Sequence, residues 1–458
     1  MEKFEFKREP INVEKIKTNN RIIDTAIPAP GTNKELELLE MYESRSMQGQ
    51  IPIVWDKAEN FNIFDKYGNK WIDFTSTIFV ANTGHGNPKV IKSVNKILNK
   101  PLLHTYAYIN QERSEYHKKL VDFAGPPFEK AFLLSAGTEA TEAALKLMRM
   151  NGQKIGKKKL GIICIEGNWH GRTMGAQMMS GNSNQKEWIG YQDPNIFHIP
   201  FPYPWTIKDR SPAIFFKEAI DKIRDQGVDI KNDVCGFMLE AFQGWGAIFY
   251  PKEFVKSIAS FCLDNKILLT FDEMQSGFAR TGKKFGYEHY EIMPDLICCG
   301  KGIASGFSLS AVVGKKEIMD LPEIGNMSST HSANPVVCAA GSATIDEIEN
   351  LNLVMETKRK GDLLFDRLNK MKNNFSDHIS LIQGKGMIAA IHFFNKKTQT
   401  PETMLPSIIC EKAMQKGLLL VHTGRESIKI GPPLTISDEA LLEGISVIEE
   451  SIAEAIAQ

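Results

Sequence analysis

Between about Pro88 and Gly341 the sequence alternates short apolar runs with longer amphipathic segments. The runs include KAFLLS, LGIICIE, DVCGFMLE, KILLTFDE and DLICCGK, and the segment TEATEAALKLMRM separates the first two. Alternation of strand-like and helix-like segments predicts an α/β domain with a mostly parallel sheet. Ligands bind such sheets at the carboxyl ends of the strands. The residues that follow each apolar run are therefore the first candidates for a functional site.

The flanking segments predict a second, smaller domain. Residues 51–74 alternate apolar and polar residues on either side of the turn sequence KYGN, which indicates a β-hairpin. After residue 341 the pattern predicts long helices over 343–369, a strand over 387–394 and a final helix from Ser437. We expect residues 1–87 to form an N-terminal arm and part of the small domain, 88–341 the large domain, and 342–458 the C-terminal small domain.

The composition excludes several classes of function. The 458 residues carry 55 Lys and Arg against 55 Asp and Glu, so no net field favours nucleic acid or an anionic membrane. The N-terminus MEKFEFKREP lacks an apolar leader, and no apolar run approaches the ~18 residues of a spanning helix. We therefore expect a cytoplasmic protein without nucleic-acid or membrane partners. The seven cysteines lack metal-ligand spacing, which predicts reduced core thiols and no metal site.

One helix start is a candidate phosphate site. The sequence LSAGTEATEAALKLMR places Gly137 and Thr138 where an apolar run passes into a helix. A helix N-terminus offers free amide N–H groups and the positive end of the dipole, which suit a phosphate. An ordinary helix cap without a ligand is the alternative. The apolar face of this helix, at i, i+3 and i+4 spacing, is predicted to consist of Ala140, Ala143, Ala144, Leu147 and Met148.

Three other apolar runs are followed by residues that can carry chemistry, namely Trp169 with His170, Asp272, and Lys301. A carboxylate at a buried strand end is costly unless it meets a cation or a donor, and lysine is rarely buried without a task. The aromatic ring of Trp169 suits stacking on a flat ligand, and the alternative for this side chain is packing in the core. The segment GKGIASG has the spacing GxGxxxG and no acidic residue about 20 positions on, so we reject a nicotinamide site.

Together these features describe a site for pyridoxal phosphate, and their order resembles that of the class III (ω-type) aminotransferases of pyridoxal-phosphate fold type I. The most specific segments are DEMQSGFARTGKKFGYE and PDLICCGKG, and the resemblance extends over nearly the whole chain. It implies an α/β fold, with a large domain on a mostly parallel sheet of the seven-stranded type and a smaller α+β domain built from both termini. It also implies a homodimer, alone or as a dimer of dimers, with active sites at the interface.

The resemblance implies a role for each candidate residue. Lys301 is similar to the catalytic Schiff-base lysine, and Asp272 to the catalytic carboxylate that pairs with the pyridine nitrogen. The other implied cofactor contacts are Gly137 and Thr138 at the phosphate, Trp169 stacked on the ring with His170 beside it, Met274 under the ring, Gln275 near the phenolic oxygen, and Thr330 reaching the phosphate across the dimer interface. Glu240 matches the first Glu of EAFQGWGA, either as a cofactor-site residue or as a structural acid that orients the region of Gln275 and Arg280.

The sequence departs from the family at two positions that bear on the substrate. Many members that act on γ- or δ-amino acids with 2-oxoglutarate carry a Glu within EAFQGWGA and an Arg before the PPL motif, which work together as a switch for the α-carboxylate. Here the two positions are Trp245 and Lys429, so the switch is absent. Lys429 and Arg425 are candidate substrate residues for a carboxylate, with a surface position as the alternative for both. Trp245 indicates a more apolar amine pocket.

The predicted function is transfer of an amino group from an ω-amino acid or other primary amine, similar to 4-aminobutyrate, to a 2-oxo acid, either pyruvate or 2-oxoglutarate. The alternatives on the same scaffold are an amino-acid epimerase, an aminomutase of the glutamate-semialdehyde type and a dialkylglycine-type decarboxylase. The cofactor residues do not separate these reactions, because the substrate pocket selects which bond breaks. A non-catalytic binding protein is disfavoured, since Lys301 and Asp272 are both present.

Overall fold

The computed structural model describes residues 4–457, which form two compact units. The larger unit comprises Pro88–Gly244 and Ile248–Val354. The smaller unit comprises the described residues up to Asn87, Trp245–Ala247, and the described residues from Met355 onward. The expected domain boundaries at residues 87 and 341 stay a prediction, because compact units need not fold independently.

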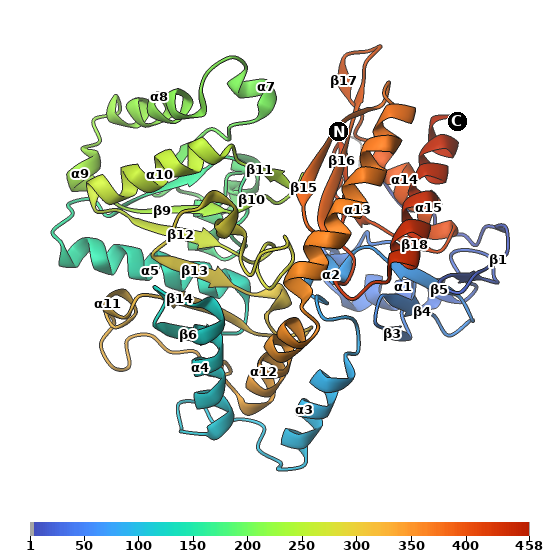
Figure 1. Ribbon diagram of the computed structural model, residues 1–458, viewed down its shortest axis with the longest axis horizontal. Helices are drawn as coiled ribbons and strands as arrows, with labels where there is room; N and C mark the ends of the chain where they lie inside the picture. Colours follow the sequence, from blue (N-terminus) through green and yellow to red (C-terminus); the bar gives the residue numbers. More distant parts are fainter. Residues whose placement is uncertain (1–3, 458) are drawn as a thin grey trace. The chain divides into compact units, whose positions relative to one another are not determined.

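The larger unit is built on a seven-stranded sheet (Figure 1). Neighbouring strands are parallel, except that β14 is antiparallel to both of its neighbours. The predicted α/β architecture with a mostly parallel sheet is confirmed. Two strands, β8 and β14, were not among the predicted runs. In spatial order the strands are β6 (Lys130–Leu134), β14 (Ser310–Gly314), β13 (Leu296–Cys299), β12 (Leu268–Asp272), β9 (Val234–Glu240), β7 (Gly161–Ile165) and β8 (Ile196–Ile199).

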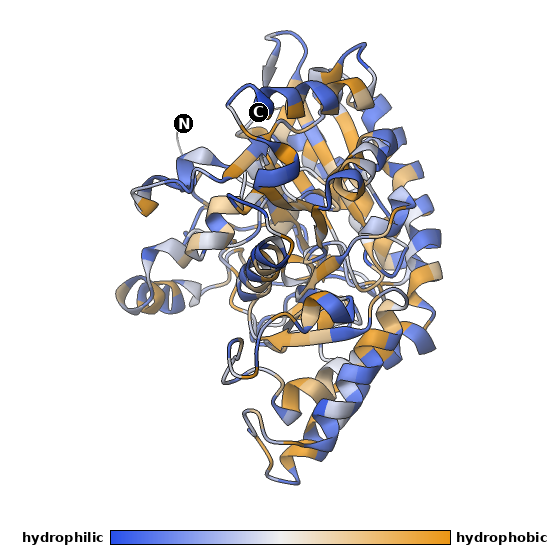
Figure 2. Cartoon of the chain, turned by 90° about the vertical axis from the view of Figure 1, so that its left-hand side faces the viewer, coloured by the Kyte–Doolittle hydropathy of each residue, from blue (hydrophilic) through white to orange (hydrophobic). Residues whose placement is uncertain are grey.

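Helices cover both faces of this sheet. Met238 on β9 packs into the core cluster that contains the apolar face of α5 (Gly137–Lys154). Its neighbour Phe237 contacts Phe216 of α8 (Pro212–Arg224), with ring centroids 6.4 Å apart. Because successive side chains of a strand point to opposite faces, α5 and α8 lie on opposite sides of β9. The five α5 residues predicted to form its apolar face are all buried. Apolar residues fill the strands, while the helices present mixed outer faces (Figure 2).

The remaining elements of the larger unit connect the strands of the sheet. The short strands β10 (Phe242–Gln243) and β11 (Ile248–Phe249) pair as an antiparallel ribbon. The other helices are α3 (Pro88–Leu98), α4 (Gln111–Ala124), α6 (Met174–Met179), α7 (Pro204–Ile207), α9 (Ile230–Asp233), α10 (Lys252–Asn265), α11 (Lys316–Met319) and α12 (Pro335–Asn350), with 3₁₀ turns at Ser183–Gln185, Glu187–Ile189, Gly286–Tyr290 and Lys301–Ile303.

The smaller unit combines segments from both ends of the chain, as expected. In its six-stranded sheet, β18 from the C-terminal part pairs in parallel with β5 from the N-terminal part. The predicted hairpin is confirmed, since Phe64 of β4 pairs with Lys70 of β5 across the KYGN turn. The strands of this sheet are β1 (Ile16–Lys17), β2 (Ile22–Ile23), β5 (Lys70–Asp73), β4 (Asn62–Phe64), β3 (Lys57–Glu59) and β18 (Leu418–Leu419).

A five-stranded sheet and five helices complete the smaller unit. The predicted final helix is confirmed as α15, and the Oγ atom of Ser437 accepts a hydrogen bond from the amide of Ala440 at 3.1 Å, which caps the helix start. The strands are β15 (Ile379–Lys385), β16 (Ile388–Asn395), β20 (Ser427–Ile430), β19 (Val421–His422) and β17 (Thr400–Pro401), and the helices are α1 (Thr32–Tyr42), α2 (Ser76–Phe79), α13 (Leu353–Asn374), α14 (Leu405–Gln415) and α15 (Asp438–Ile456), with a 3₁₀ turn at Arg45–Met47.

Three global expectations concern membranes, cysteines and metals. Within residues 4–457, no helix has the length and apolar character needed to cross a bilayer. All seven cysteines are buried and none forms a disulfide, as predicted. Across the same residues, no group of three or more His, Cys, Asp or Glu side chains has an arrangement that would hold a metal ion.

Candidate active site

The register of the large sheet brings three ionisable groups to one edge. Asp272, the last residue of β12, lies opposite Glu240 of β9 and opposite Cys298 of β13. Lys301 follows Cys298 by three positions in the sequence. Because the carboxyl ends of neighbouring parallel strands meet at one edge, Glu240, Asp272 and Lys301 gather there without any special loop.

The Asp272 carboxylate is held from both sides. Its Oδ2 atom lies 2.8 Å from Nδ1 of His170, and its Oδ1 atom accepts a hydrogen bond from the amide of Met274 at 3.1 Å. A carboxylate accepts only, so Nδ1 of His170 carries the proton. The other ring nitrogen, Nε2, is buried and has no hydrogen-bond partner among residues 4–457. The predicted pair of Asp272 and His170 therefore forms a buried, oriented unit at the strand end.

Lys301 occupies a strained backbone position with a perturbed amine. Lys301 begins a 3₁₀ turn, and its φ of 43° is a left-handed backbone conformation that residues other than glycine rarely adopt. Burial lowers the pKa of the Lys301 amine, while the negative charges of Asp272 and Glu240 act in the opposite direction. A lowered pKa favours the neutral amine, which is the form that attacks a carbonyl carbon.

Glu240 is the third member of this edge. Its carboxylate accepts hydrogen bonds from the Trp169 amide at 3.0 Å and from Nε2 of Gln275 at 3.2 Å. Burial raises the pKa of the Glu240 carboxyl to about 7, and the charge of Asp272 acts in the same direction. The structure therefore brings Gln275 and Trp169, both predicted cofactor contacts, to one acid.

Gly137 and Thr138 open α5 as predicted. Their amides stand in the first helical turn, where no preceding helical carbonyl is available. Met274 fills the space beside this turn, since a Cβ atom on Gly137 would lie 2.8 Å from its sulfur, and one on Gly300 would lie 2.4 Å from it. Glycine at both positions lets the thioether approach the helix start and the residue before Lys301 at once.

One residue near this site, Arg172, was not singled out by the sequence analysis. The guanidinium carbon of Arg172 lies 4.5 Å from the centre of the Trp169 ring, close enough for a cation–π contact. Arg172 is exposed and forms no ion pair among residues 4–457. The available signal was its position three residues after Trp169, in the same strand-end segment GNWHGR.

Thr330 lies in an exposed segment of the same unit. Nε2 of His104 donates a hydrogen bond to the Thr330 carbonyl at 2.7 Å. Thr330 also lines a surface depression of about 590 Å³ together with Ser135, Glu142 and Thr173. Thr173 in turn lies 2.7 Å from the Thr138 hydroxyl. Thr330 therefore shares this depression with a residue that contacts the helix-start residue Thr138.

The three candidate substrate residues belong to the smaller unit. The guanidinium carbon of Arg425 stacks 3.8 Å from the centre of the Trp245 ring, and Arg425 also pairs with Glu426 at 3.2 Å. Lys429 on β20 is buried, with its ammonium nitrogen 4.8 Å from the centre of the Phe79 ring. Arg425 and Trp245 are thus in contact, and Lys429 is no surface charge.

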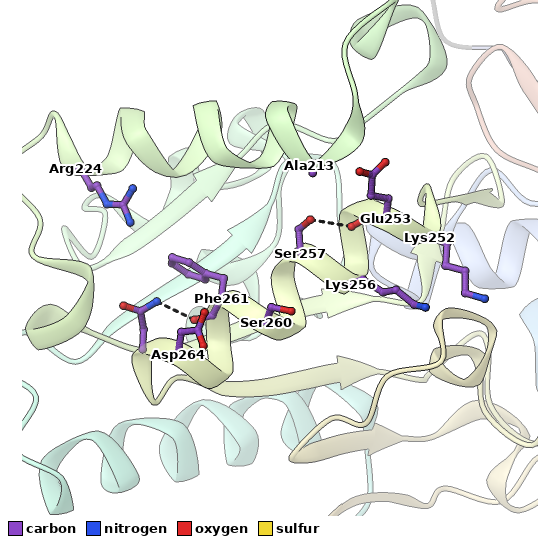
Figure 3. Close-up of a pocket in the computed structure, with 10 residues that line it drawn as sticks. Ala213, Arg224, Lys252, Glu253, Lys256, Ser257, Ser260, Phe261 and Asp264 are labelled. Atoms are coloured by element: carbon purple, nitrogen blue, oxygen red, sulfur yellow. Dashed lines mark hydrogen bonds between the residues drawn. The ribbon is translucent and has the colours of Figure 1, made fainter.

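A second depression, of about 840 Å³, lies between α8 and α10 (Figure 3). Its basic side chains have acidic partners, because Lys252 and Lys256 both pair with Glu291, and Arg224 pairs with Asp221. None of the predicted site residues lines it. We therefore place the candidate active site at the strand ends and not in this depression.

The strand-end residues fit pyridoxal phosphate. Lys301 supplies an amine with a lowered pKa, Asp272 a buried carboxylate for a ring nitrogen, and Gly137 with Thr138 a helix start for a phosphate. The unpartnered Nε2 atom of His170 is a further buried polar atom at the same edge. A lysine amine, a carboxylate and a helix start are the kinds of group that the aldehyde, ring nitrogen and phosphate of this cofactor require.

Comparisons with known proteins agree with this arrangement. The sequence profile of the family described as aminotransferase class-III matches residues 44–452. The chain is 34% identical to the 5-aminovalerate aminotransferase of Pseudomonas putida over 89% of this chain and 95% of that one. It is 30% identical to the alanine/serine racemase of Pyrococcus horikoshii over 98% of this chain and 96% of that one.

A solved structure shares the fold. The crystal structure of a Bacillus anthracis aminotransferase superposes with a TM-score of 0.84 over 92% of this chain and 98% of that one, at 24% identity. At that identity the likeness supports the fold alone, and it agrees with the seven-stranded sheet described above. The family profile that matches most of the chain, and the relative at 34% identity, show that the protein belongs to the class III aminotransferases and is a pyridoxal-phosphate-dependent enzyme.

Proposed function

We propose that the protein transfers an amino group from an ω-amino acid or another primary amine to a 2-oxo acid, either pyruvate or 2-oxoglutarate. The observation that carries the proposal is the convergence of Asp272, Glu240 and Lys301 at one sheet edge. The Pseudomonas putida relative is named for 5-aminovalerate, an ω-amino acid, which supports a donor with its amine at the end of a chain.

Lys301 is the proposed catalytic base and cofactor anchor. When bound, pyridoxal phosphate supplies an aldehyde that combines with amines and a ring that accepts electrons from the substrate carbon. The Lys301 amine would hold that aldehyde between turnovers and, once displaced by the substrate amine, would carry a proton. Its lowered pKa supports both tasks, because each requires the neutral amine.

Asp272 is proposed to keep the ring nitrogen protonated. Opposite charges ~4 Å apart at an effective dielectric of ~20 attract by about 4 kcal/mol, which is roughly 3 pKa units. Its hydrogen bond with His170 supports this role, because the imidazole fixes the direction of the carboxylate. His170 would act through Asp272 and is therefore a positioning residue.

The roles of the remaining cofactor residues are proposed from their places at the strand ends and at the start of α5. Gly137 and Thr138 would bind the phosphate at the start of α5, Trp169 would stack on the ring, and Met274 would lie below it. Gln275 would donate to the phenolic oxygen from the side of Glu240.

Arg172 is the proposed contact for a substrate carboxylate. Its guanidinium is exposed, lies over the proposed stacking residue Trp169, and pairs with no acid among residues 4–457. A guanidinium fork suits a carboxylate better than an ammonium does. The predicted substrate residues Trp245, Arg425 and Lys429 stay a prediction. Lys429 is buried, which supports contact with a ligand over the alternative of a solvent-exposed surface charge.

The protein is also proposed to form a homodimer. Exposed apolar side chains, including Leu103, Tyr108 and Ile109, cluster in the segment of His104, which donates to Thr330. Exposed apolar patches often mark interfaces. Sedimentation velocity tests this proposal with I109D, which should weaken the dimer, against L263D on α10 as a control, since Ile109 and Leu263 are 97% and 81% exposed. A monomeric wild type would refute it. A dimer of dimers and a cytoplasmic location stay predictions.

Racemisation is the second candidate function. The relative from Pyrococcus horikoshii is named an alanine/serine racemase and matches almost the whole chain. Trp245 and Lys429 replace the residues of the switch that alternates between two half-reactions, and a racemase, which has no second substrate, needs no such switch. Racemisation needs the same Lys301 and Asp272 but no 2-oxo acid.

One experiment separates the two functions. Purified protein loaded with pyridoxal phosphate is incubated with 5-aminovalerate, 4-aminobutyrate or alanine, with and without pyruvate or 2-oxoglutarate, and the products are resolved on a chiral column. Transamination predicts alanine or glutamate only when the oxo acid is present. Racemised alanine without oxo acid, and no amino transfer from any amine, would refute the proposal. K301A is the control and should be inactive in both assays.

A further inference from the structure

The loop of residues 167–173, which lies between β7 and α6 and carries Trp169, is fastened to the start of α5. The amide of Thr173 donates a hydrogen bond to Oγ1 of Thr138 at 3.2 Å, and the hydroxyl oxygens of these two residues lie 2.7 Å apart. Gly171 permits this approach, since a Cβ atom there would lie 2.2 Å from Oγ1 of Thr138. The proposed stacking loop and the proposed phosphate site therefore meet at one hydroxyl group.

Glu142 of α5 decides which of the two hydroxyl groups donates. Its Oε1 atom accepts hydrogen bonds from the Thr173 hydroxyl at 2.7 Å and from the amides of Gly175 and Ala176 at 2.8 and 3.2 Å. A carboxylate only accepts, and a hydroxyl has one hydrogen to give. Thr173 gives its hydrogen to the charged partner, because that bond is the stronger one. The hydrogen between the two hydroxyl oxygens therefore belongs to Thr138.

The Thr138 hydroxyl thus has no hydrogen left for a ligand. It donates to the Thr173 hydroxyl and accepts from the Thr173 amide. By contrast, the amides of Gly137 and Thr138 donate to no group of residues 4–457. A phosphate accepts hydrogen bonds, so at this helix start it finds two amide donors but no hydroxyl donor.

We propose that Glu142 is a positioning residue, which acts through Thr173 to turn the Thr138 hydroxyl toward the loop and away from the phosphate. Backbone amides alone then bind the phosphate at the start of α5, and the hydroxyl holds the loop of Trp169 in place. The inference rests on the proposed function in one respect, since it takes pyridoxal phosphate as the ligand, with its ring on Trp169.

A second contact ties the middle of the same loop to α5. Oγ1 of Thr141 is shared between the His170 carbonyl at 2.8 Å and the Thr138 carbonyl at 2.9 Å, and the Thr141 side chain is buried. This contact does not involve the Thr138 hydroxyl. Removing that hydroxyl should therefore loosen only the end of the loop near Thr173, and the protein should still fold.

Two ligands separate the possible roles of the Thr138 hydroxyl, namely pyridoxal phosphate and pyridoxal, which lacks the phosphate. T138V keeps the shape of the side chain and removes the hydroxyl. Because the hydroxyl acts on the loop, T138V should raise the dissociation constants of both ligands by the same factor, about fivefold, as for one neutral hydrogen bond. Both constants are measured on apo protein by the visible absorption of the bound ligand. A rise for pyridoxal phosphate alone, or for neither ligand, would overturn the proposal.

T173V tests the connection between Glu142 and Thr138. It removes the hydroxyl that links them, so it should change both dissociation constants as T138V does. In the double variant T138V/T173V the two effects should not add, because each single variant breaks the same hydrogen bond. Fully additive effects would show that the two hydroxyl groups act separately, which contradicts the proposal.

Two variants of Glu142 test its part as an acceptor. E142Q should leave both dissociation constants near the wild-type values, since the side-chain oxygen of Gln can accept where Oε1 does. E142L has no acceptor and should raise both constants. The proposal fails if E142L matches the wild type or if E142Q matches E142L. Should E142L not yield folded protein, T173V decides in its place.

T398V is the matched control. The hydroxyl oxygens of Thr398 and Thr400 lie 2.8 Å apart in the smaller unit, as a second pair of threonines outside the proposed cofactor contacts. T398V should change neither constant, and an effect equal to that of T138V would overturn the proposal. None of these assays contains an amine or oxo acid substrate, so the inference can fail while amino transfer by the wild type stands. A wild type that binds pyridoxal phosphate but transfers no amino group would instead refute the proposed function alone.

Discussion

Nδ1 of His170 lies 2.8 Å from Oδ2 of Asp272, and both side chains are almost completely buried. The imidazole therefore holds the carboxylate in one direction at the carboxyl end of β12. This pair places a carboxylate with a fixed orientation at the same sheet edge as Lys301.

D272N should retain the cofactor and lose most of the catalysis. An Asn side chain keeps the shape but removes an attraction of about 4 kcal/mol for a ring cation, so we expect the first half-reaction to slow at least 100-fold. Stopped-flow absorbance with 5-aminovalerate measures that rate. D295N is the control, because Asp295 pairs with Lys315 at 2.7 Å in the same unit. A D272N rate within tenfold of the wild type would contradict the proposed role.

R172Q should affect only donors that carry a carboxylate. Without the guanidinium over Trp169, the KM for 5-aminovalerate should rise about tenfold or more, since a bidentate ion pair is lost. The kcat/KM for a simple primary amine without a carboxylate should stay unchanged. R210Q serves as the control, because Arg210 lies over Phe215 at 4.9 Å, in a comparable cation–π contact away from the strand ends. Equal losses for both donor types would argue against carboxylate recognition.

The double variant W245E/K429R should shift the acceptor preference toward 2-oxoglutarate. It introduces the acid and the arginine that many family members carry at these positions, and the guanidinium fork binds a carboxylate in two places. We expect the ratio of kcat/KM for 2-oxoglutarate over pyruvate to rise about tenfold. W245F/K429R is the control, because it keeps an aromatic face for Arg425, which now stacks 3.8 Å from Trp245. An unchanged ratio in W245E/K429R would show that these positions do not select the acceptor.

The raised pKa of the Glu273 carboxyl predicts how the stability of the protein depends on pH. Burial raises the pKa of its carboxyl from about 4.5 to about 7, although it accepts hydrogen bonds from the amides of Gly286 and Tyr287 at 2.7 and 2.8 Å. Because the folded pKa exceeds the unfolded one, folding takes up a proton between these values. The contribution to the free energy of unfolding is therefore full below about pH 4.5 and is lost as the pH rises through 7.

E273Q should flatten that dependence. Thermal unfolding of the apo protein between pH 5 and 8 should show a Tm that falls less steeply with pH than in the wild type, with Glu240 still contributing in the same direction. E291Q is the control, since the pKa of Glu291 is lowered by Lys252 and Lys256 and its titration lies below this range. The same slope in E273Q and the wild type would contradict the predicted titration.

The strand-end residues of the site were predictable because parallel strands all end at the same edge of the sheet. Asp272 and Lys301 each follow an apolar run, and parallel strands deliver their carboxyl ends to one edge. Arg172 was not predicted, because its contact with the Trp169 ring depends on the path of a loop and has no periodic signal. The strands β8 and β14 were missed for a similar reason, since short runs such as IFHI and SAVVG are found in both strands and other segments.

By itself, the sequence determined the α/β class, the order of the strand-end residues and the membership of the family, since these follow from local patterns and from motif order. The tertiary structure decided which of those residues act on each other. It set Glu240 opposite Asp272, tied Gln275 and Trp169 to one carboxylate, and stacked Arg425 on Trp245. These are contacts between residues tens to hundreds of positions apart, and only strand register and packing determine whether such residues meet.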